Sequence, residues 1–427
     1  MRITLWLVTS LLLFTLAVAP GPSIAGKDPD RFQILSRFSQ VLELVGEQYV
    51  KPISREELID DALKGMLEQL DPHSTYLNPT EFSGMQESTS GEFSGIGIEI
   101  SMEENNRLTV VTPIEDTPAF EAGLQAGDHI LKIDGTPTYD MTLTEAVKMI
   151  RGEKGSSVVL TILHDGASEA EDISIVRGTI PIVSVKTTAL EGNVLLVRMT
   201  RFNENTTRML REGINDYRAD KELKGVILDL RNNPGGVLSQ AVSVADTFIE
   251  DGLIVYVQGR NEADRQDYFA TRNSNDVSVP LVTMINSGSA SAAEIVAGAL
   301  QDHNRALLIG ERSFGKGSVQ SLYPLSGGAG IKLTTALYYT PNGRSIQATG
   351  IEPDLTIPFQ VPSMKEDRKR AEYFREKDLS GHLENANGDT AEEHTISSKT
   401  KSLLERDNQL RMALELVKKL PKLRSIK

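Results

Sequence analysis

Three serines follow an apolar stretch near the middle of the second half of the chain. Leu281 to Asn286 has the composition of a buried strand. The turn that follows this strand and leads into a helix is Ser287-Gly-Ser-Ala-Ser291. A serine at such a turn lies beside unbonded backbone N–H groups and the positive end of the helix dipole, where an oxyanion is stabilised. The same segment could instead be only a serine-rich helix cap. The segment alone leaves both interpretations open.

A lysine further along the chain could act as the base. Lys316 stands between Gly315 and Gly317, in the stretch Phe314-Gly-Lys-Gly-Ser-Val-Gln320. Small neighbours allow a close approach to another backbone, and a lysine acts as a base near neutral pH when burial and neighbouring groups lower its pKa. The alternative is a surface lysine in a glycine-rich hairpin.

The histidines offer no obvious base for a serine nucleophile. His382 and His394 fall in a charged segment, and His73, His129 and His164 fall in regions N-terminal to the serine-bearing strand. His303 ends the helix that begins at Ser291, about 18 Å away by helical rise. A serine-lysine pair needs no histidine, so the dyad is the preferred interpretation.

A glycine-rich turn could complete an oxyanion site. Asp229-Leu-Arg-Asn-Asn-Pro-Gly235-Gly236 follows an apolar strand and precedes a helix. The N–H of Gly235 or Gly236 could join that of Ala292 as an oxyanion donor. The sequence is equally typical of a tight strand-to-helix turn, and both roles can hold together.

Alternating elements must position these residues. From Val194 to Ile285, apolar strands alternate with helices, which is typical of a sheet covered on both faces. Between about Gly91 and Val176, the pattern predicts short strands and one helix, a barrel-like module of about ninety residues. The strands are expected at 96–101, 108–112, 129–133, 158–163 and 173–176, and the helix at 143–150.

The two ends of the chain have different patterns. Leu35, Phe38, Leu42, Val45 and Tyr49 share one face of an expected helix. A capping pattern at Ser54 and Glu57 predicts a second helix, so the pair forms a hairpin that cannot bury its apolar stripes alone. Residues 362–402 are charged and are expected to be a solvated linker, followed by a short helix over 403–420.

Composition and the N-terminus limit the classes of function. The 427 residues carry a formal net charge of -14, which gives no basic face for nucleic acid. Residues 1–25 have the pattern of a secretory signal cut after Ala25, or of a membrane anchor if they are not cleaved. The chain has no cysteine, so thiol catalysis and thiolate metal sites are excluded. We expect an exported protein of the periplasm or cell envelope.

Taken together, these motifs resemble those of the carboxy-terminal processing peptidases, also called tail-specific proteases. The resemblance runs from about Phe32 to Phe359. Its most specific parts are Ser289-Ala-Ser291-Ala-Ala-Glu294-Ile, Ala297-Gly-Ala-Leu-Gln-Asp302 and Phe314-Gly-Lys316-Gly-Ser-Val-Gln320. Supporting matches are Leu70-Asp-Pro-His-Ser-Thr-Tyr76, Phe93-Ser-Gly-Ile-Gly-Ile98, Gly127-Asp-His-Ile-Leu-Lys-Ile-Asp-Gly135 and the glycine-rich turn.

The resemblance implies a role for each matching residue. The nucleophile is the second serine of the Ser-Ala-Ser element, Ser291, and the base is Lys316. Gln320 would orient the lysine amine, and Asp302 is a supporting residue that could equally end its helix by pairing with Arg305. Ala293 departs from the pattern, because many members have another serine there.

The small module resembles a PDZ domain, which binds extended peptides by strand addition and holds a terminal carboxylate in backbone N–H groups. Gly95-Ile96-Gly97-Ile98 would be the carboxylate loop. Leu143, Val147 and Ile150 would line an apolar pocket for the last side chain of the substrate, although their spacing also fits plain core residues.

The expected protein is therefore an α/β multidomain enzyme with a crotonase-like or ClpP-like protease core, an inserted PDZ-type module and an N-terminal helical hairpin. Its domains are a signal peptide (1–25), a helical region (28–90), a PDZ domain (91–178), a protease core (179–360) and a charged tail with a short helix (361–427). It would be a serine endopeptidase acting at or near apolar C-termini, with no metal or cofactor.

The expected partners are protein or peptide substrates with free apolar C-termini, an activator or adaptor protein, and a second copy of the chain in a dimer. One alternative function is a catalytically silent PDZ scaffold. Against the scaffold, both Ser291 and Lys316 are present. A crotonase is a further alternative, but it needs neither this serine and lysine spacing nor an exported PDZ-like module.

Overall fold

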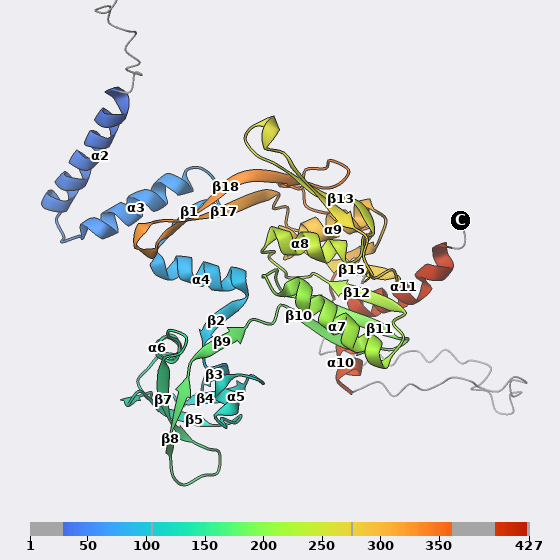
Figure 1. Cartoon of the computed structure of the whole chain (residues 1–427), viewed down its shortest axis with the longest axis horizontal. Coiled ribbons are helices and arrows are strands. Elements are labelled where there is room, and N and C mark those ends of the chain that lie inside the picture. Colours follow the sequence, from blue (N-terminus) through green and yellow to red (C-terminus); the bar gives the residue numbers. More distant parts are fainter. Residues whose placement is uncertain (1–28, 104–105, 275, 361–397, 425–427) are drawn as a thin grey trace, which may run out of the picture. The chain divides into compact units, whose positions relative to one another are not determined.

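The computed structural model describes residues 29–103, 106–274, 276–360 and 398–424. The predicted signal peptide and most of the predicted linker lie outside these residues. The chain divides into two compact units, residues 1–78 and 79–427 (Figure 1). In the described part of the chain, no helix is both long and apolar enough to cross a membrane.

The first unit contains the predicted helical hairpin. Helix α2 spans Pro29–Gln48, α3 spans Arg55–Glu68, and β1 spans Thr75–Leu77. The Ser54 side chain accepts a hydrogen bond from the N–H of Glu57, so α3 begins where the capping pattern predicted. Much of the apolar stripe on α2 stays exposed, including Leu35 and Phe38.

The PDZ-type module opens the second unit. Helix α4 (Pro79–Ser90) precedes β2 (Glu92–Gly95), which pairs antiparallel with β9 (Gly178–Pro181) and so joins the two ends of the module. The predicted strand over 96–101 begins only at Ile98, because Gly97 has a φ of +82°. A side chain at Gly97 would overlap Thr117, so this break requires glycine.

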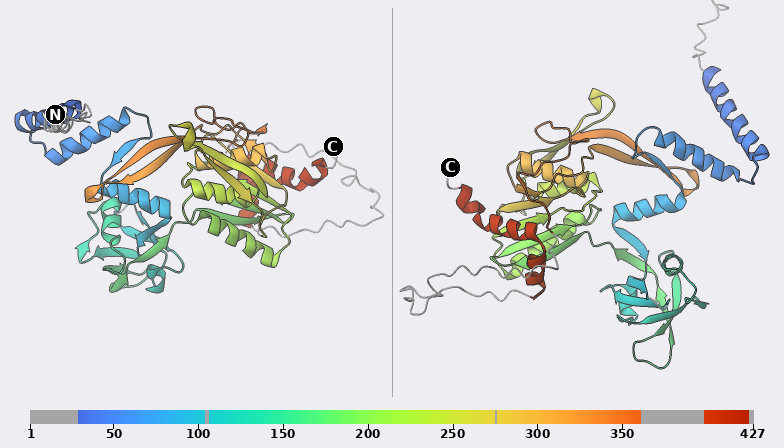
Figure 2. Two further views of the ribbon diagram at one scale, coloured as in Figure 1. Left: turned by 45° about the horizontal axis from the view of Figure 1, so that its top comes forward. Right: turned by 180° about the vertical axis from the view of Figure 1, so that it is seen from behind.

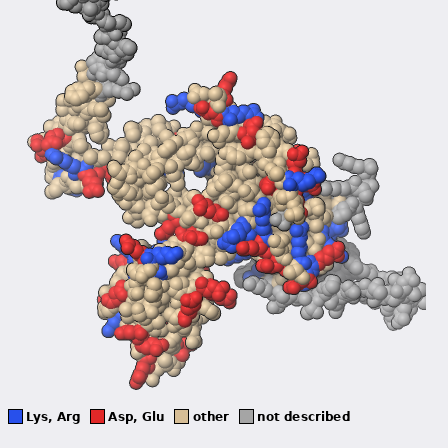
Figure 3. All heavy atoms as spheres, viewed as in Figure 1, with Lys and Arg blue, Asp and Glu red and all other residues tan. Residues whose placement is uncertain are grey.

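The sheet of the module has the order β3-β4-β5-β7-β8, with β6 beside β5. Its elements are β3 (Ile98–Met102), β4 (Leu108–Pro113), α5 (Pro118–Glu121), β5 (His129–Ile133), β6 (Thr136–Pro137), α6 (Leu143–Ile150), β7 (Ser157–Leu163) and β8 (Glu171–Val176). Alternate side chains of β7, Val158, Leu160 and Ile162, are buried in its core. Acidic residues outnumber basic ones on this module, and several are visible in Figure 3.

The region that follows the PDZ-type module contains the predicted covered sheet, with the strand order β10-β11-β12-β15-β16-β19. Its strands are β10 (Val185–Leu190), β11 (Val194–Met199), β12 (Gly225–Asp229), β15 (Leu281–Ile285), β16 (Leu307–Gly310) and β19 (Leu355–Thr356). All neighbours are parallel except β10 and β11. The carboxyl ends of β12 and β15 therefore lie side by side, and the glycine turn and the serine turn follow these two strands.

Helices cover both faces of this sheet. Helices α7 (Thr206–Asp220), α8 (Leu238–Asp246) and α9 (Ala292–Asp302) share one core with Leu195 and Val226. Helix α11 (Asn408–Arg424) covers the opposite face through Leu410, Leu414 and Val417, as the view from behind in Figure 2 shows. The prediction of a sheet covered on both faces is confirmed.

The C-terminal prediction needs correction. One short helix of unknown use was expected over 403–420, but α10 (Ser398–Arg406) and α11 form two consecutive helices. The last residues of the predicted linker therefore belong to α10. Helix α11 has an apolar face. This face packs on the side of the sheet that helices α7, α8 and α9 do not cover.

A second sheet contributes a wall of the site. Strands β17 (Ser318–Pro324) and β18 (Gly330–Tyr339) form a long antiparallel pair. On its other side β18 pairs with β13 (Asp251–Gln258), which in turn pairs with β14 (Gln266–Thr271). The sequence analysis did not predict β17 or β18.

Candidate active site

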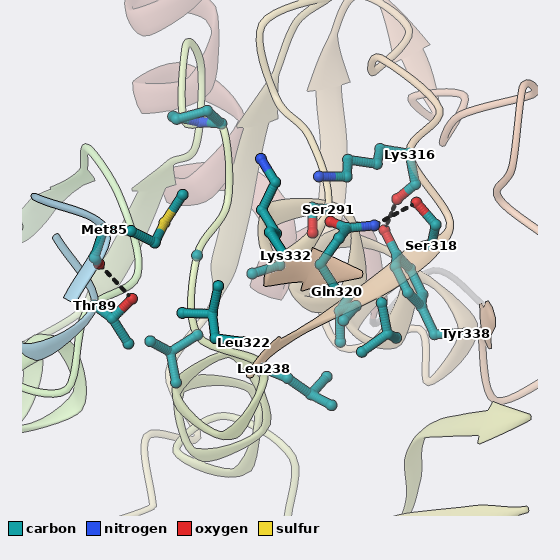
Figure 4. A pocket seen from close by; sticks show the side chains of 16 residues that line it. Met85, Thr89, Leu238, Ser291, Lys316, Ser318, Gln320, Leu322, Lys332 and Tyr338 are labelled. Carbon is teal, nitrogen blue, oxygen red and sulfur yellow. Dashed lines mark hydrogen bonds between the residues drawn. The ribbon is translucent and has the colours of Figure 1, made fainter. Parts of the chain in front are cut away.

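Ser291, Lys316 and Gln320 line one pocket of about 360 Å³. Ala292 and Gly236 also line it, so the structure brings the predicted nucleophile, base, supporting amide and two oxyanion donors together (Figure 4). The walls come from α4, the glycine turn, the start of α9, and the β17–β18 pair.

Ser291 is the residue that precedes α9, and its backbone has a φ of +54°. For a residue other than glycine, this backbone conformation costs about 1–3 kcal/mol, and such conformations are often found at functional sites. Ser289 is buried and donates its hydroxyl to the carbonyl of Leu230 at 2.8 Å, and Ser287 is exposed. Of these three described serines, Ser291 is the one that lines the pocket.

A buried carboxylate connects Ser291 to the loop that carries Lys316. Glu294 is 0% exposed and accepts hydrogen bonds from the N–H groups of Ser291 (2.7 Å), Gly315 (2.7 Å) and Lys316 (2.9 Å), and from the Ser313 hydroxyl (2.6 Å). Burial raises the pKa of Glu294, and these hydrogen bonds act in the opposite direction. The sequence analysis gave Glu294 no role, although the Ser-x-x-Glu spacing is the signal of a capping box.

The lysine side chain points toward the Ser291 hydroxyl in Figure 4. The two flanking glycines permit this placement. A side chain added at Gly315 would come within 3.0 Å of the backbone N of Gly350, and one at Gly317 within 2.7 Å of the backbone N of Gln347. The loop therefore packs closely against another backbone segment, as the glycines predicted.

Tyr338 is a further pocket residue that the sequence analysis missed. Its hydroxyl donates a hydrogen bond to the carbonyl of Lys316. Burial and the charge of Glu294 raise the pKa of Tyr338 well above its ordinary value, while a hydrogen bond with the Ser291 side chain opposes the shift. Tyr338 thus stays protonated between the nucleophile and the lysine loop. No sequence pattern distinguishes it from the other tyrosines.

Gln320 reaches into the pocket from β17. Its side-chain nitrogen donates to the hydroxyls of Ser318 (2.9 Å) and Thr334 (3.3 Å). These two bonds fix the amide, so its oxygen is the atom left to accept a hydrogen bond from an amine. Lys332 on β18 brings a second lysine side chain to the pocket (Figure 4). The apolar lining comes from Met85, Leu238, Ile295, Val319 and Leu322.

The two glycines of the turn have different roles. The N–H of Gly235 donates to the side-chain oxygen of Asn233 at 2.9 Å, so this group is engaged within the turn. A side chain at Gly235 would lie 2.8 Å from Cβ of Ser291, so this glycine sets how closely the turn approaches the nucleophile. Gly236 lines the pocket. The geometry therefore favours Gly236 and Ala292 as the oxyanion donors.

Asp302 lies at the opposite end of α9 from Ser291. Its carboxylate pairs with Arg344 and accepts the N–H of Asn342 at 2.9 Å. The expected partner, Arg305, donates to the carbonyls of Phe248 and Val279, both at 2.8 Å. Asp302 thus anchors the segment after β18 to the end of α9, remote from the nucleophile.

The candidate peptide groove of the PDZ-type module is only partly as predicted. Strand β3 is an edge strand beside α6, Leu143 is exposed and Val147 is half-buried. Ile150 is 5% exposed and Ile96 is 1% exposed, and both belong to the module core. Ile150 is therefore part of the module core, as the alternative interpretation expected, and its contact with a bound peptide stays a prediction.

The carboxylate loop has a suitable orientation. The carbonyl of Ile96 accepts the N–H of Ala119, and that of Gly97 accepts the N–H of Ile114, both at 2.8 Å within the module. Because N–H and C=O point in opposite directions across a trans peptide, the N–H groups of Gly97 and Ile98 point the other way. Gly95, the first residue of the predicted loop, is the last residue of β2.

No group of three or more histidine and carboxylate side chains that could hold a metal ion occurs in the described ranges.

Comparisons with known proteins show the family of the chain. The model described as peptidase family S41 matches residues 193–357, a PDZ domain model matches 94–175, and the model described as the N-terminal domain of the activating protease CtpB matches 23–80. A carboxy-terminal-processing protease of Bartonella bacilliformis is 43% identical over 386 residues, which is 90% of this chain and 88% of that protein.

Other relatives are more distant. The carboxy-terminal processing protease CtpA of Bacillus subtilis is 36% identical over 321 residues, covering 75% of this chain and 68% of that protein. Among solved structures, a photosystem II D1 C-terminal processing protease is 32% identical with a TM-score of 0.43, covering 76% of this chain and 87% of that one. The chain therefore belongs to the serine-type carboxy-terminal processing proteases of peptidase family S41, with an inserted PDZ domain.

Proposed function

We propose that Ser291 is the nucleophile and Lys316 the general base of this protease, and that the PDZ domain selects substrates with apolar C-terminal tails. The observation that carries the dyad is the shared pocket. Ser291 directly precedes α9 and has a positive φ, the Lys316 side chain points toward it, and Gly236 and Ala292 line the same pocket.

In the acylation step, the Ser291 oxygen bonds to the scissile carbonyl carbon, and its proton passes to the neutral amine of Lys316. The N–H groups of Ala292 and Gly236 hold the oxyanion. Cleavage of the C–N bond releases the downstream fragment, whose new amine takes the proton from Lys316. Water then attacks the ester with Lys316 again as base, which frees the acid product and restores Ser291.

Substrate selection is assigned to the PDZ domain. A tail would add a strand to the edge strand β3, its carboxylate would meet the N–H groups of Gly97 and Ile98, and its last side chain would contact Leu143 and Val147. The partly exposed apolar side chains support a preference for apolar tails.

The test compares cleavage of an unfolded protein with a free apolar C-terminus by the parent chain, Ser291→Ala and Lys316→Ala. Both variants should lose cleavage by orders of magnitude, because the two residues act as a unit. A matched substrate ending in a C-terminal amide should be cleaved less efficiently by the parent. Retained cleavage in either variant would contradict the dyad, and equal cleavage of both substrates would contradict tail recognition.

Export and dimerisation complete the proposal. The pattern of residues 1–25 supports export to the periplasm or cell envelope, which predicts that the mature protein from cells begins at Gly26. The exposed apolar side chains Leu35 and Phe38 on α2 support a homodimer formed through the helical hairpin. Replacing both with glutamate should halve the mass measured by light scattering, and an unchanged mass would exclude this interface.

A further inference from the structure

Arg231 is a buried cation on the glycine turn, outside the pocket. It is 7% exposed, and its guanidinium donates two hydrogen bonds to Asp229, both at 2.9 Å. It donates two more to Asp407, at 2.6 and 3.2 Å, and one to Gln409 at 2.8 Å. Burial by itself lowers the pKa of Arg231, but the two carboxylates raise it overall, so the guanidinium stays charged.

The partners of Arg231 on the C-terminal side lie at the start of α11. Oδ1 of Asp407 accepts the N–H of Leu410 at 2.9 Å, which makes Asp407 the N-terminal cap of the helix, and both carboxylate oxygens of Asp407 accept from Arg231. Gln409 is also buried, and its nitrogen donates to the carbonyl of Ile357 at 2.6 Å. The beginning of α11 is therefore fixed to the turn by directional, charge-assisted bonds.

The turn transmits this anchoring to the nucleophile. The next residue, Asn232, exchanges hydrogen bonds of 2.8 and 2.9 Å with Asn286 at the end of β15. The carbonyl of Asn233 accepts the N–H of Ala290 at 2.9 Å, one residue before Ser291. Together with the close approach of Gly235 to Ser291, these contacts mean that a shift of Arg231 moves the oxyanion donor relative to the nucleophile.

We propose that Arg231, Asp407 and Gln409 form a positioning latch through which the C-terminal helix α11 holds the glycine turn at the distance from Ser291 that oxyanion binding requires. These three are positioning residues, because they act through Gly236 and do not touch the substrate. The latch gives the C-terminal helix a part in catalysis beyond covering the sheet. It rests on the mechanism proposed above.

The experiment uses the full chain with two latch variants and one control. Asp407→Asn keeps a side chain that caps helices well but removes the charge facing Arg231, and Gln409→Leu removes the second acceptor. The control is Val417→Ala, which weakens the packing of α11 on the sheet at a buried site away from Arg231. Each protein is assayed for kcat, KM, unfolding midpoint and the affinity of a peptide boronic acid, which mimics the tetrahedral intermediate.

In the latch variants, kcat should fall by roughly tenfold to a hundredfold with KM within about twofold, because small misplacements act on the transition state. The affinity for the boronic acid should fall by a similar factor. Val417→Ala should lower the unfolding midpoint while kcat and boronic acid affinity stay near the parental values.

Two results would overturn the latch. One is parental kcat and boronic acid affinity in Asp407→Asn. The other is a loss of kcat that follows the loss of thermal stability equally in all three variants, since that would make α11 only a structural cover. A parent that neither cleaves nor binds the boronic acid would overturn the dyad mechanism and the latch with it, and so is distinguishable from failure of the latch alone.

Discussion

The catalytic pocket and the PDZ groove are built in opposite ways. Buried polar groups hold the pocket together, with partners far apart in the sequence, as when Glu294 joins the start of α9 to the loop at 313–316. The groove consists of an edge strand and a short helix, with Leu143 and Val147 partly exposed. We infer that single changes in the pocket abolish a step of the reaction, whereas changes in the groove only weaken substrate capture.

The largest effect is expected for Glu294→Gln. A glutamine has one acceptor oxygen for four donors, so buried N–H groups lose their partners and the lysine loop shifts away from Ser291. We expect kcat to fall by about a hundredfold or more. The control is Glu352→Gln, in an exposed ion pair with Arg312, which should leave kcat unchanged. Parental turnover in Glu294→Gln would remove the proposed difference between the two regions.

An intermediate effect is expected in the groove. Val147→Asp puts a charge where the last apolar side chain of the tail would lie, so KM for an unfolded protein with an apolar tail should rise about tenfold. Lys148→Asp, on the exposed side of α6, is the matched control. Cleavage of a short peptide ending in an amide should not change in either variant. A fall in kcat for that peptide would instead show that the groove directly affects the chemistry.

The smallest effect concerns the stability of the PDZ domain. His164 contacts Asp128 at 2.7 Å and Glu171 at 2.8 Å, and these hydrogen bonds raise its pKa above 6.5 against an opposing effect of burial. A raised pKa in the folded state stabilises the fold below about pH 6.5, and this contribution disappears as the pH rises through the folded-state pKa.

His164→Gln should therefore lower the unfolding midpoint of the full chain at pH 5.5 more than at pH 8.5, without changing kcat at either pH. Thermal unfolding of both proteins at the two pH values measures this difference. An equal difference in unfolding midpoint between the parent and His164→Gln at both pH values would mean that His164 acts through packing and not through its charge.

Sequence patterns predicted much of the fold and the nucleophile turn. Apolar runs predicted β5, α6, β11 and β15, and the strand-to-helix turn indicated the serine segment 287–291, because these features depend on neighbouring residues. The glycines around Lys316 indicated a close backbone approach for the same reason. Family resemblance then separated Ser291 from Ser289, which the pattern alone could not do.

The missed features depend on contacts between distant segments. The Glu294 carboxylate accepts hydrogen bonds from a loop about twenty residues later in the chain. Arg231 donates to Asp407, which lies 176 residues later in the chain. The helical period put Ile150 on the same face as Leu143 and Val147, but it does not show how deeply each of these side chains is buried. The burial of Ile150 depends on the packing of the whole module.

The most direct test of the central claim is the rate at which a serine-directed fluorophosphonate labels the protein, with the labelled residue assigned by mass spectrometry. The parent should be labelled at Ser291, and Lys316→Ala should be labelled at least about a hundredfold more slowly at an unchanged unfolding midpoint, because the base that activates the serine is gone. Equal labelling rates in the two proteins, or a label on Ser289, would contradict the Ser291 and Lys316 dyad.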